Sequence, residues 1–164
     1  NDAIRQEAAR NAEYQHMGTT LVCAVARSDM AIIGNIGDSR AYHITPEGIF
    51  QISRDHSVVE NMVAKGDLTP LEARTHPNRN LITRALGPDI HAKADTFELP
   101  WHKDEFLLLC SDGLVNTVSD QEMLFEVLHD GDVNECLDHL LQISLQRGAP
   151  DNITAVLLLN EEGR

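Results

Sequence analysis

Residues 105–113, with the sequence EFLLLCSDG, constrain the fold more than any other stretch of the chain. The apolar run from Phe106 to Cys110 is too short for a buried helix and has no polar positions at helical spacing. It therefore predicts a strand that is buried on both faces. Asp112 then stands where a rigid strand reaches the surface, and Gly113 allows backbone or a ligand to approach closely. On this stretch alone, an Asp-Gly turn that merely ends the strand is the more common arrangement.

The length and composition are those of one globular domain. The chain has 164 residues, of which 42% are hydrophobic and 24% are charged. This is enough for a substantial core and too short for two ordinary domains. No window approaches the roughly 20 apolar residues of a membrane helix, and the polar first residues do not predict a signal peptide.

The charge balance limits the classes of partner. Formal net charge is −13, from 13 Lys+Arg against 26 Asp+Glu. Nucleic acids and anionic membranes select basic surfaces, so we expect neither as a partner, whereas divalent cations are compatible with an acidic surface. Cys23, Cys110 and Cys136 are an odd number without CxxC spacing. Cys23 and Cys110 lie in apolar runs, which predicts small core residues in a reducing compartment and hence a cytoplasmic protein.

Hydrophobic periodicity and turn residues predict an α+β chain with mainly antiparallel sheets and helices packed on their faces. Strands are expected over residues 19–26, 30–36, 41–45, 49–52, 81–86, 94–99, 106–110 and 153–159, and helices over residues 2–14, 57–65, 70–75, 119–129 and 132–147. The first four strands, joined by tight turns, predict an antiparallel meander.

Local signals place several helix ends. Gly66 is a typical residue after a helix, Thr69 and Pro70 begin the next helix, and Ser119 with Glu122 forms a capping box. The helices at 57–65 and 70–75 have little apolar face, so we expect this segment to pack weakly and to be mobile.

Three carboxylates occupy similar places, because Asp38, Asp112 and Asp151 each end or precede an apolar run beside a small or turn-forming residue. Mg²⁺ and Mn²⁺ prefer carboxylate, carbonyl and water oxygens on a rigid frame. No His or Cys cluster has the spacing of a zinc site. The spacing alone is equally compatible with one shared metal site and with three independent turns.

Other motifs are weaker. Gly37-Asp38-Ser39 is similar to the nucleophile block of small ester hydrolases, but none of the 8 histidines has the Asp three residues earlier that such enzymes need. Ser39 is therefore expected to be a turn hydroxyl rather than a nucleophile. The glycines at 34 and 37 do not complete a dinucleotide fingerprint, and there is no P-loop.

Six short blocks follow one another in a defined order. They are MGTT at 17–20, GDSRAY at 37–42, DHS at 55–57, RNLITRALG at 79–87, CSDGL at 110–114 and DNIT at 151–154. With these blocks the chain closely resembles the metal-dependent protein phosphatases of the PP2C (PPM) family, specifically the compact bacterial type. The resemblance runs from about residue 1 to about residue 160.

This resemblance implies an αββα sandwich of two mainly antiparallel sheets, with helices on the outer faces and a binuclear Mn²⁺ or Mg²⁺ centre at one edge. Asp112 and Asp151 match ligands of that centre, and Asp38 matches a ligand of the third, weaker metal of bacterial members. Residues 55–80 match the flap beside the active site. Arg40, Arg79 and Arg84 are expected to brace loops rather than to bind phosphate, and His56 is expected to be structural.

The implied activity is hydrolysis of phosphoserine and phosphothreonine in proteins by a metal-activated water. Two cations would lower the pKa of that water and neutralise the phosphoryl oxygens. The implied substrates are phosphorylated proteins, targets of a serine/threonine kinase, and we expect a monomer.

The chain departs from the family pattern at its start, where the blocks with the phosphate-binding Arg and the metal-bridging Asp-Gly are absent. Asp2 and Glu7 lie on the first predicted helix without an adjacent glycine and do not replace them. We therefore expect residues 1–164 to be a phosphatase domain that is incomplete at its N-terminus and lacks the full binuclear centre. The alternative function is a catalytically inactive, phosphatase-derived binding or regulatory module.

Overall fold

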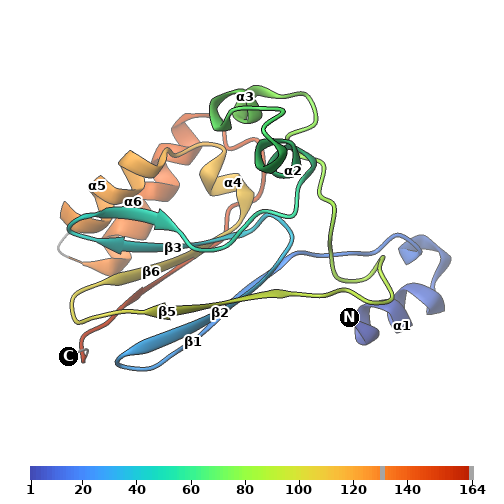
Figure 1. Cartoon of the computed structure of the whole chain (residues 1–164), viewed down its shortest axis with the longest axis horizontal. Helices are drawn as coiled ribbons and strands as arrows, with labels where there is room; N and C mark the ends of the chain where they lie inside the picture. Colours follow the sequence, from blue (N-terminus) through green and yellow to red (C-terminus); the bar gives the residue numbers. More distant parts are fainter. Residues whose placement is uncertain (130–131, 163–164) are drawn as a thin grey trace.

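The computed structural model describes residues 1–129 and 132–162, which form two packed antiparallel sheets with helices beside them (Figure 1). The helices are α1 Asp2–Arg10, the 3-10 helix η1 Ala12–Tyr14, α2 Val58–Lys65, α3 Pro70–Thr75, α4 Asp112–Val115, α5 Asp120–His129 and α6 Val133–Gln146. The strands are β1 Leu21–Ala26, β2 Met30–Ile36, β3 Arg40–Thr45, β4 Gly48–Gln51, β5 Asp95–Pro100, β6 Phe106–Cys110 and β7 Ala155–Leu159. Within these described ranges, no helix has the length and apolar composition needed to cross a membrane.

The first four strands, which were predicted to form one meander, are distributed over two sheets. One sheet has the order β1-β2-β5 and the other the order β4-β3-β6-β7, and every pairing is antiparallel. The α+β class is thus confirmed, but the prediction of one four-stranded meander is wrong. β1 with β2 and β3 with β4 are hairpins, and the link between β2 and β3 carries the chain from one sheet to the other. This placement lets each hairpin bury one face against the opposite sheet.

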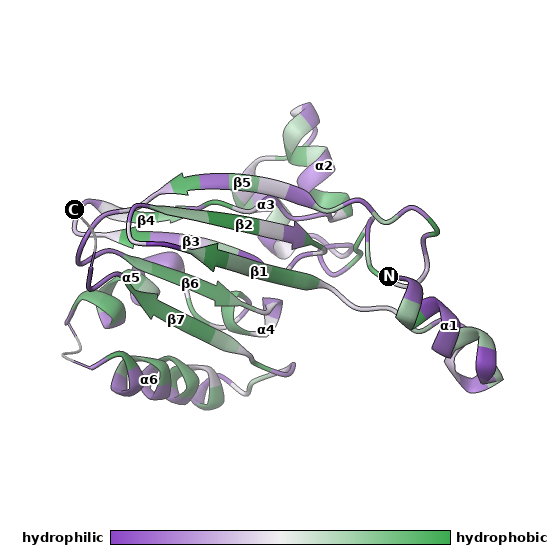
Figure 2. Ribbon diagram, turned by 90° about the horizontal axis from the view of Figure 1, so that it is seen from below, coloured by the Kyte–Doolittle hydropathy of each residue, from purple (hydrophilic) through white to green (hydrophobic). Residues whose placement is uncertain are grey.

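β6 is buried on both faces, as its apolar run predicts. Leu107 joins the cluster between the sheets, which includes Ile33 and Trp101. Leu108 and Cys110 point to the other side, into the cluster that the sheet forms with the helices. Figure 2 shows the hydrophobic side of α6 facing β7 and its hydrophilic side turned away. The site-bearing strand is therefore held by two cores.

The outer face of the first sheet differs from the expectation for Cys23. Cys110 is buried, but Cys23 is exposed. It shares the outer face with Val25 and Ile32, which are 68% and 48% exposed. The period of β1 directs alternate residues to opposite faces, and periodicity alone does not say which face is covered.

Residues 81–86 do not form the strand that their β-branched and apolar residues predict. They make only isolated bridges, Thr19 with Leu86 and Ser57 with Ile82. A strand needs a continuous ladder of partners, and this segment makes only single bridges to residues 19 and 57. The prediction is wrong because β-propensity depends on the residues of the segment itself, whereas a strand ladder needs a partner strand from elsewhere in the chain.

The helix caps agree with the sequence, although the first predicted helix breaks at Asn11, which has extended backbone. Ser57 caps α2, Gly66 ends it with φ 81°, and Thr69 forms a capping box with Glu72 in α3. α3 buries no residue and α2 buries only Val59. The predicted weak packing of this segment is confirmed, and its mobility stays a prediction.

Candidate functional site

Antiparallel register brings the three aspartate-bearing segments to one edge of the second sheet. Arg40, at the start of β3, pairs with Cys110 at the end of β6, which in turn pairs with Ala155 at the start of β7. Asp38 precedes β3, Asp112 follows β6 and Asp151 precedes β7. The three aspartates therefore lie at the same edge, because adjacent antiparallel strands begin and end there.

Backbone and hydroxyl contacts join the Asp112 and Asp151 segments. Ser111 N donates to Thr154 O at 2.9 Å, and Thr154 N donates to Ser111 Oγ at 3.0 Å. Gly113 lies so close to Asn152 that a Cβ there would stand 2.3 Å from Asn152 O. Only glycine permits this approach without a backbone shift.

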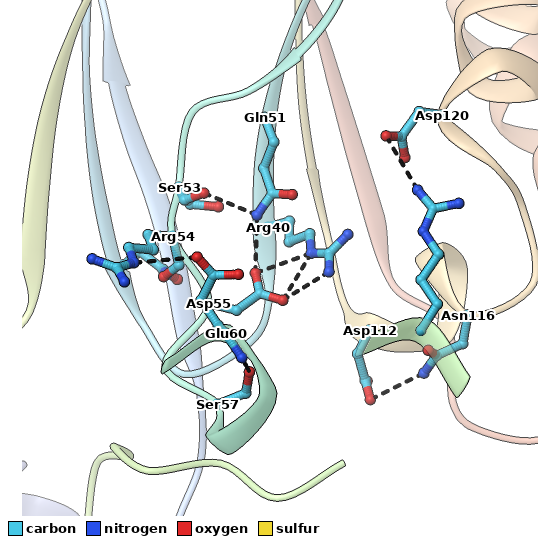
Figure 3. Close-up of polar contacts among 12 residues, drawn as sticks. Arg40, Gln51, Ser53, Arg54, Asp55, Ser57, Glu60, Asp112, Asn116 and Asp120 are labelled. Atoms are coloured by element: carbon cyan, nitrogen blue, oxygen red, sulfur yellow. Dashed lines mark hydrogen bonds and ion pairs between the residues drawn. The ribbon is translucent and has the colours of Figure 1, made fainter. Parts of the chain in front are cut away.

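Asp112 does not stand in a turn, which corrects the simpler expectation for an Asp-Gly pair. It is the first residue of the short helix α4, which follows directly from β6. Asn116 Nδ2 lies 3.4 Å from Asp112 Oδ2, one helical turn on (Figure 3). The strand and the helix together fix the direction of the carboxylate.

The turn that carries Asp38 is held by His56. Gly37 has φ 106°, and its N–H donates to His56 Nδ1 at 3.0 Å while His56 N donates to Gly37 O at 2.8 Å. Because Nδ1 accepts, the ring proton is on Nε2, which lies 3.0 Å from Asp95 Oδ2. The buried His56 therefore has a structural role, as expected.

Two arginines brace the site rather than extend into it. The Arg40 guanidinium holds the Asp55 carboxylate through Nε at 3.0 Å and Nη2 at 2.8 Å (Figure 3). Arg40 Nη1 also donates to Tyr42 Oη at 2.9 Å. Arg84 Nη1 contacts Asp95 Oδ1 at 2.8 Å. Arg40 and Arg84 make the bracing contacts that were expected, and Arg79 is exposed. That these arginines do not bind phosphate stays a prediction.

The electrostatics of the edge are those of crowded carboxylates. Burial raises the pKa of Asp112, and the neighbouring Asp151 carboxylate raises it further. Burial also raises the pKa of Asp38, followed by the charges of Asp112 and Asp55. Like charges disfavour ionisation of one another, so the edge favours a bound cation. In residues 1–129 and 132–162, however, no group of three or more His, Cys, Asp and Glu side chains is arranged to hold a metal ion.

Sequence reasoning missed the partner of Arg40. Asp55 belongs to the DHS block, but nothing in its local pattern indicates an ion pair with a residue 15 positions earlier. Ser39 does more than the expected turn hydroxyl, because its Oγ lies 2.9 Å from Thr20 Oγ1, just before β1. Both contacts join segments that only the tertiary structure brings together.

The fold and site together define an α+β sandwich with an acidic, cation-attracting edge. The chain belongs to the protein phosphatase 2C family, whose family model matches residues 1–157. The serine/threonine phosphatase stp of Listeria monocytogenes is 35% identical over 167 residues, covering 100% of this chain and 66% of that protein.

Two solved structures support the same assignment. Serine/threonine phosphatase Stp1 from Staphylococcus aureus has a TM-score of 0.91 at 41% identity, covering 96% of this chain and 62% of that chain. The catalytic domain of serine/threonine protein phosphatase PstP, in complex with two manganese ions, has a TM-score of 0.84 at 32% identity over 94% of this chain and 64% of that chain. The chain thus spans slightly less than two thirds of these relatives.

Proposed function

We propose that the complete protein is a Mn²⁺- or Mg²⁺-dependent protein serine/threonine phosphatase that hydrolyses phosphoserine and phosphothreonine. The observation that carries this proposal is the meeting of Asp112 and Asp151 at the end of β6 and the start of β7, in a family whose member PstP binds two manganese ions. None of the relatives named above is described as a non-enzymatic module.

The donor set suits a hard cation. Asp112, Asp151 and Asp38 supply only oxygen atoms. Burial raises the pKa values of Asp112 and Asp38, and neighbouring carboxylates raise them further. Asp112 and Asp151 would hold the two-metal centre, and Asp38 would hold a third, weaker ion. Among the described residues no group of three or more His, Cys, Asp and Glu side chains is arranged to hold a metal ion, so these aspartates would supply only part of the coordination shell.

The cations would supply Lewis acidity, which activates water and neutralises charge on the phosphoryl group. The residues of this chain would hold the metal-binding carboxylates in position. Asp112 is aimed by β6 and α4, and Asp151 is held beside it by the contacts of Ser111. The Arg40 guanidinium is engaged by Asp55 and Tyr42 and is therefore not free to bind phosphate. Its positive charge partly offsets the negative charge of Asp38 and Asp112.

The surroundings of the site complete the proposal. Residues 55–80 would act as a flap whose weakly packed helices α2 and α3 order on substrate binding. The expected substrates are phosphorylated proteins, targets of a serine/threonine kinase, acted on by a cytoplasmic monomer.

The test is hydrolysis of p-nitrophenyl phosphate and of phosphopeptides by the complete natural protein. We expect turnover only with Mn²⁺ or Mg²⁺, and faster release of phosphate from phosphoserine and phosphothreonine than from phosphotyrosine. Asp112→Asn is expected to lower kcat by about 100-fold or more, because a Lewis acid contributes several kcal/mol. Glu98→Gln, on the exposed outer face opposite Ile32, is the control and should retain full activity.

An Asp112→Asn variant with full activity would remove Asp112 from the metal site. Absence of turnover with every divalent cation, by a folded protein that still binds phosphopeptides, would instead favour the binding-module alternative.

A further inference from the structure

The last turn of α6 is joined by a buried hydroxyl contact to the segment that follows α4. Ser144 is fully buried, and its Oγ donates to Leu140 O at 3.0 Å. Thr117 Oγ1 lies 2.8 Å from Ser144 Oγ and 2.9 Å from Gly113 O, so its proton can serve either acceptor. A serine in the otherwise apolar buried face of α6 therefore has a specific partner in the segment that follows Asp112.

A second contact reaches the same segment from the surface. Arg147 Nη1 donates to Thr117 O at 2.6 Å and to Glu122 Oε2 at 2.9 Å, and its Nη2 binds the other Glu122 oxygen. Glu122 also accepts from Ser119 N at 2.9 Å in the capping box of α5. One guanidinium thus holds the end of α6 against both the segment after α4 and the first turn of α5.

These contacts connect the segments that carry the two candidate ligands, Asp112 and Asp151, at two places. Asp112 is the first residue of α4. Ser111, just before α4, is bound to residues 152 and 154, just before β7, and Thr117, two residues after α4, is bound to Ser144 of α6. Asp151 lies in the loop that joins α6 to β7. The two segments that flank the Asp151 loop are therefore attached to the two ends of the Asp112 helix.

The loop itself adds little freedom. It leaves α6 through Gly148, with φ 91°, and Ala149, with φ 32°, and Ala149 N donates to Ser144 O at 3.0 Å. Asn152 O then accepts a hydrogen bond from Ser111 Oγ at 3.3 Å. With both ends fixed, the separation of the Asp112 and Asp151 carboxylates depends on how firmly α6 is held to α4.

We propose that Ser144 and Arg147 are positioning residues that set the spacing of Asp112 and Asp151 for metal binding. The inference rests on the proposed function, because it concerns the same metal site. Neither side chain contacts the carboxylates, so each acts through the backbone of α4 and of the 148–152 loop. Residues behind metal ligands tune affinity by about 10–100-fold, and the smaller end of that range is expected here.

The experiment compares Ser144→Ala, Arg147→Ala and Arg147→Lys in the complete natural protein. Each variant is titrated with Mn²⁺ by electron paramagnetic resonance of the free ion, and its thermal midpoint and steady-state kinetics are measured. We expect Ser144→Ala and Arg147→Ala to weaken Mn²⁺ binding by about 10-fold with KM for the phosphate ester unchanged, and saturating Mn²⁺ to restore kcat. Arg147→Lys should be intermediate, since lysine keeps the charge but not the bidentate contact.

Asn160→Ala is the matched control. Asn160 is also buried, and its Nδ2 donates to Ser28 O at 3.0 Å. Its backbone pairs with Glu105, at the end of β6 opposite to Asp112. This variant should lower the thermal midpoint and leave the Mn²⁺ dissociation constant as in the parent.

The outcomes separate the two proposals. If Ser144→Ala and Arg147→Ala lower only the thermal midpoint, or if Asn160→Ala weakens Mn²⁺ binding equally, the positioning role is overturned while the phosphatase activity stands. If the parent binds Mn²⁺ without hydrolysing any phosphoester, the proposed function fails and the binding titrations still decide the positioning role. A parent that binds no Mn²⁺ overturns both.

Discussion

Gly113 illustrates how one residue links two segments of the site. It lies in α4, where alanine would favour the helix, yet a Cβ would stand 2.3 Å from Asn152 O. Gly113→Ala is therefore expected to destabilise the protein by about 1–3 kcal/mol, as overpacking does, and to weaken Mn²⁺ binding. Urea unfolding and Mn²⁺ titration measure the two effects.

Gly66→Ala is the comparison for Gly113→Ala. Gly66 has φ 81°, but no atom lies within 4 Å of the place where a Cβ would stand. Its variant should therefore cost about 1–2 kcal/mol of left-handed backbone strain without affecting Mn²⁺ binding. Unchanged Mn²⁺ affinity in Gly113→Ala would contradict the close approach as a determinant of the site.

Asp112 should destabilise the metal-free protein at neutral pH. Its pKa in the folded protein lies above the ordinary value of 3.8, so the folded state holds this proton more tightly than the unfolded chain. The resulting stabilisation is present below pH 3.8 and is lost as the pH rises through the raised pKa. Asp112→Asn should raise the free energy of unfolding at pH 7 in EDTA, and the gain should shrink on acidification.

Asp95→Asn provides a control of opposite sign. Its hydrogen bond with His56, and then its contact with Arg84, lower the pKa of Asp95. That carboxylate stabilises the fold above the ordinary pKa and loses its contribution as the pH falls through the lowered value. Urea unfolding at pH 7 should show Asp95→Asn as less stable than the parent, and this deficit should shrink only below pH 3.8. Parallel pH profiles for Asp95→Asn and Asp112→Asn would refute the assignment.

At the scale of elements, two similar capping boxes test what packing adds to a helix. Thr69 with Glu72 begins α3, and Ser119 with Glu122 begins α5. α3 buries no residue, whereas α5 buries Met123 and Val127. Removing either cap costs about 1 kcal/mol of helix stability, but only α5 transmits that cost to the core.

Thr69→Ala should therefore increase proteolysis between residues 66 and 80 with little change in the urea midpoint. Ser119→Ala should lower the global midpoint and leave cleavage of that segment unchanged. Equal shifts of the global midpoint in the two variants would show that α3 is part of the cooperative core, against the proposed flap.

The elements also show how far pattern reasoning reaches. The continuous apolar run at 106–110, the caps at Thr69 and Ser119, and the glycine after α2 all depend on neighbouring residues, and local patterns predict each of them correctly. The predictions for residues 81–86 and for Cys23 are wrong, because a strand ladder and a covered sheet face depend on segments far away in the sequence.

For the whole molecule, binding of Mn²⁺ should raise stability by linkage. A cation that binds only the folded state adds about 2.7 kcal/mol at 100 times its dissociation constant. Thermal unfolding should shift upward with Mn²⁺ and return with EDTA. Asp112→Asn and Asp151→Asn should abolish the shift while Glu98→Gln retains it, and a shift that survives in both aspartate variants would place the ion elsewhere.

Local structure and the residue types of the site follow from the sequence alone: the doubly buried strand before Asp112, the helix caps, and the aspartates at the ends of apolar runs. These depend on chain stiffness, side-chain period and hydrogen bonds between near neighbours. Long-range packing, by contrast, assigns β2 and β3 to different sheets, pairs Arg40 with Asp55, and places Ser144 against Thr117. Above all, antiparallel pairing of β3, β6 and β7 decided that Asp38, Asp112 and Asp151 share one edge, because strand partnership is chosen by long-range packing that no local pattern encodes.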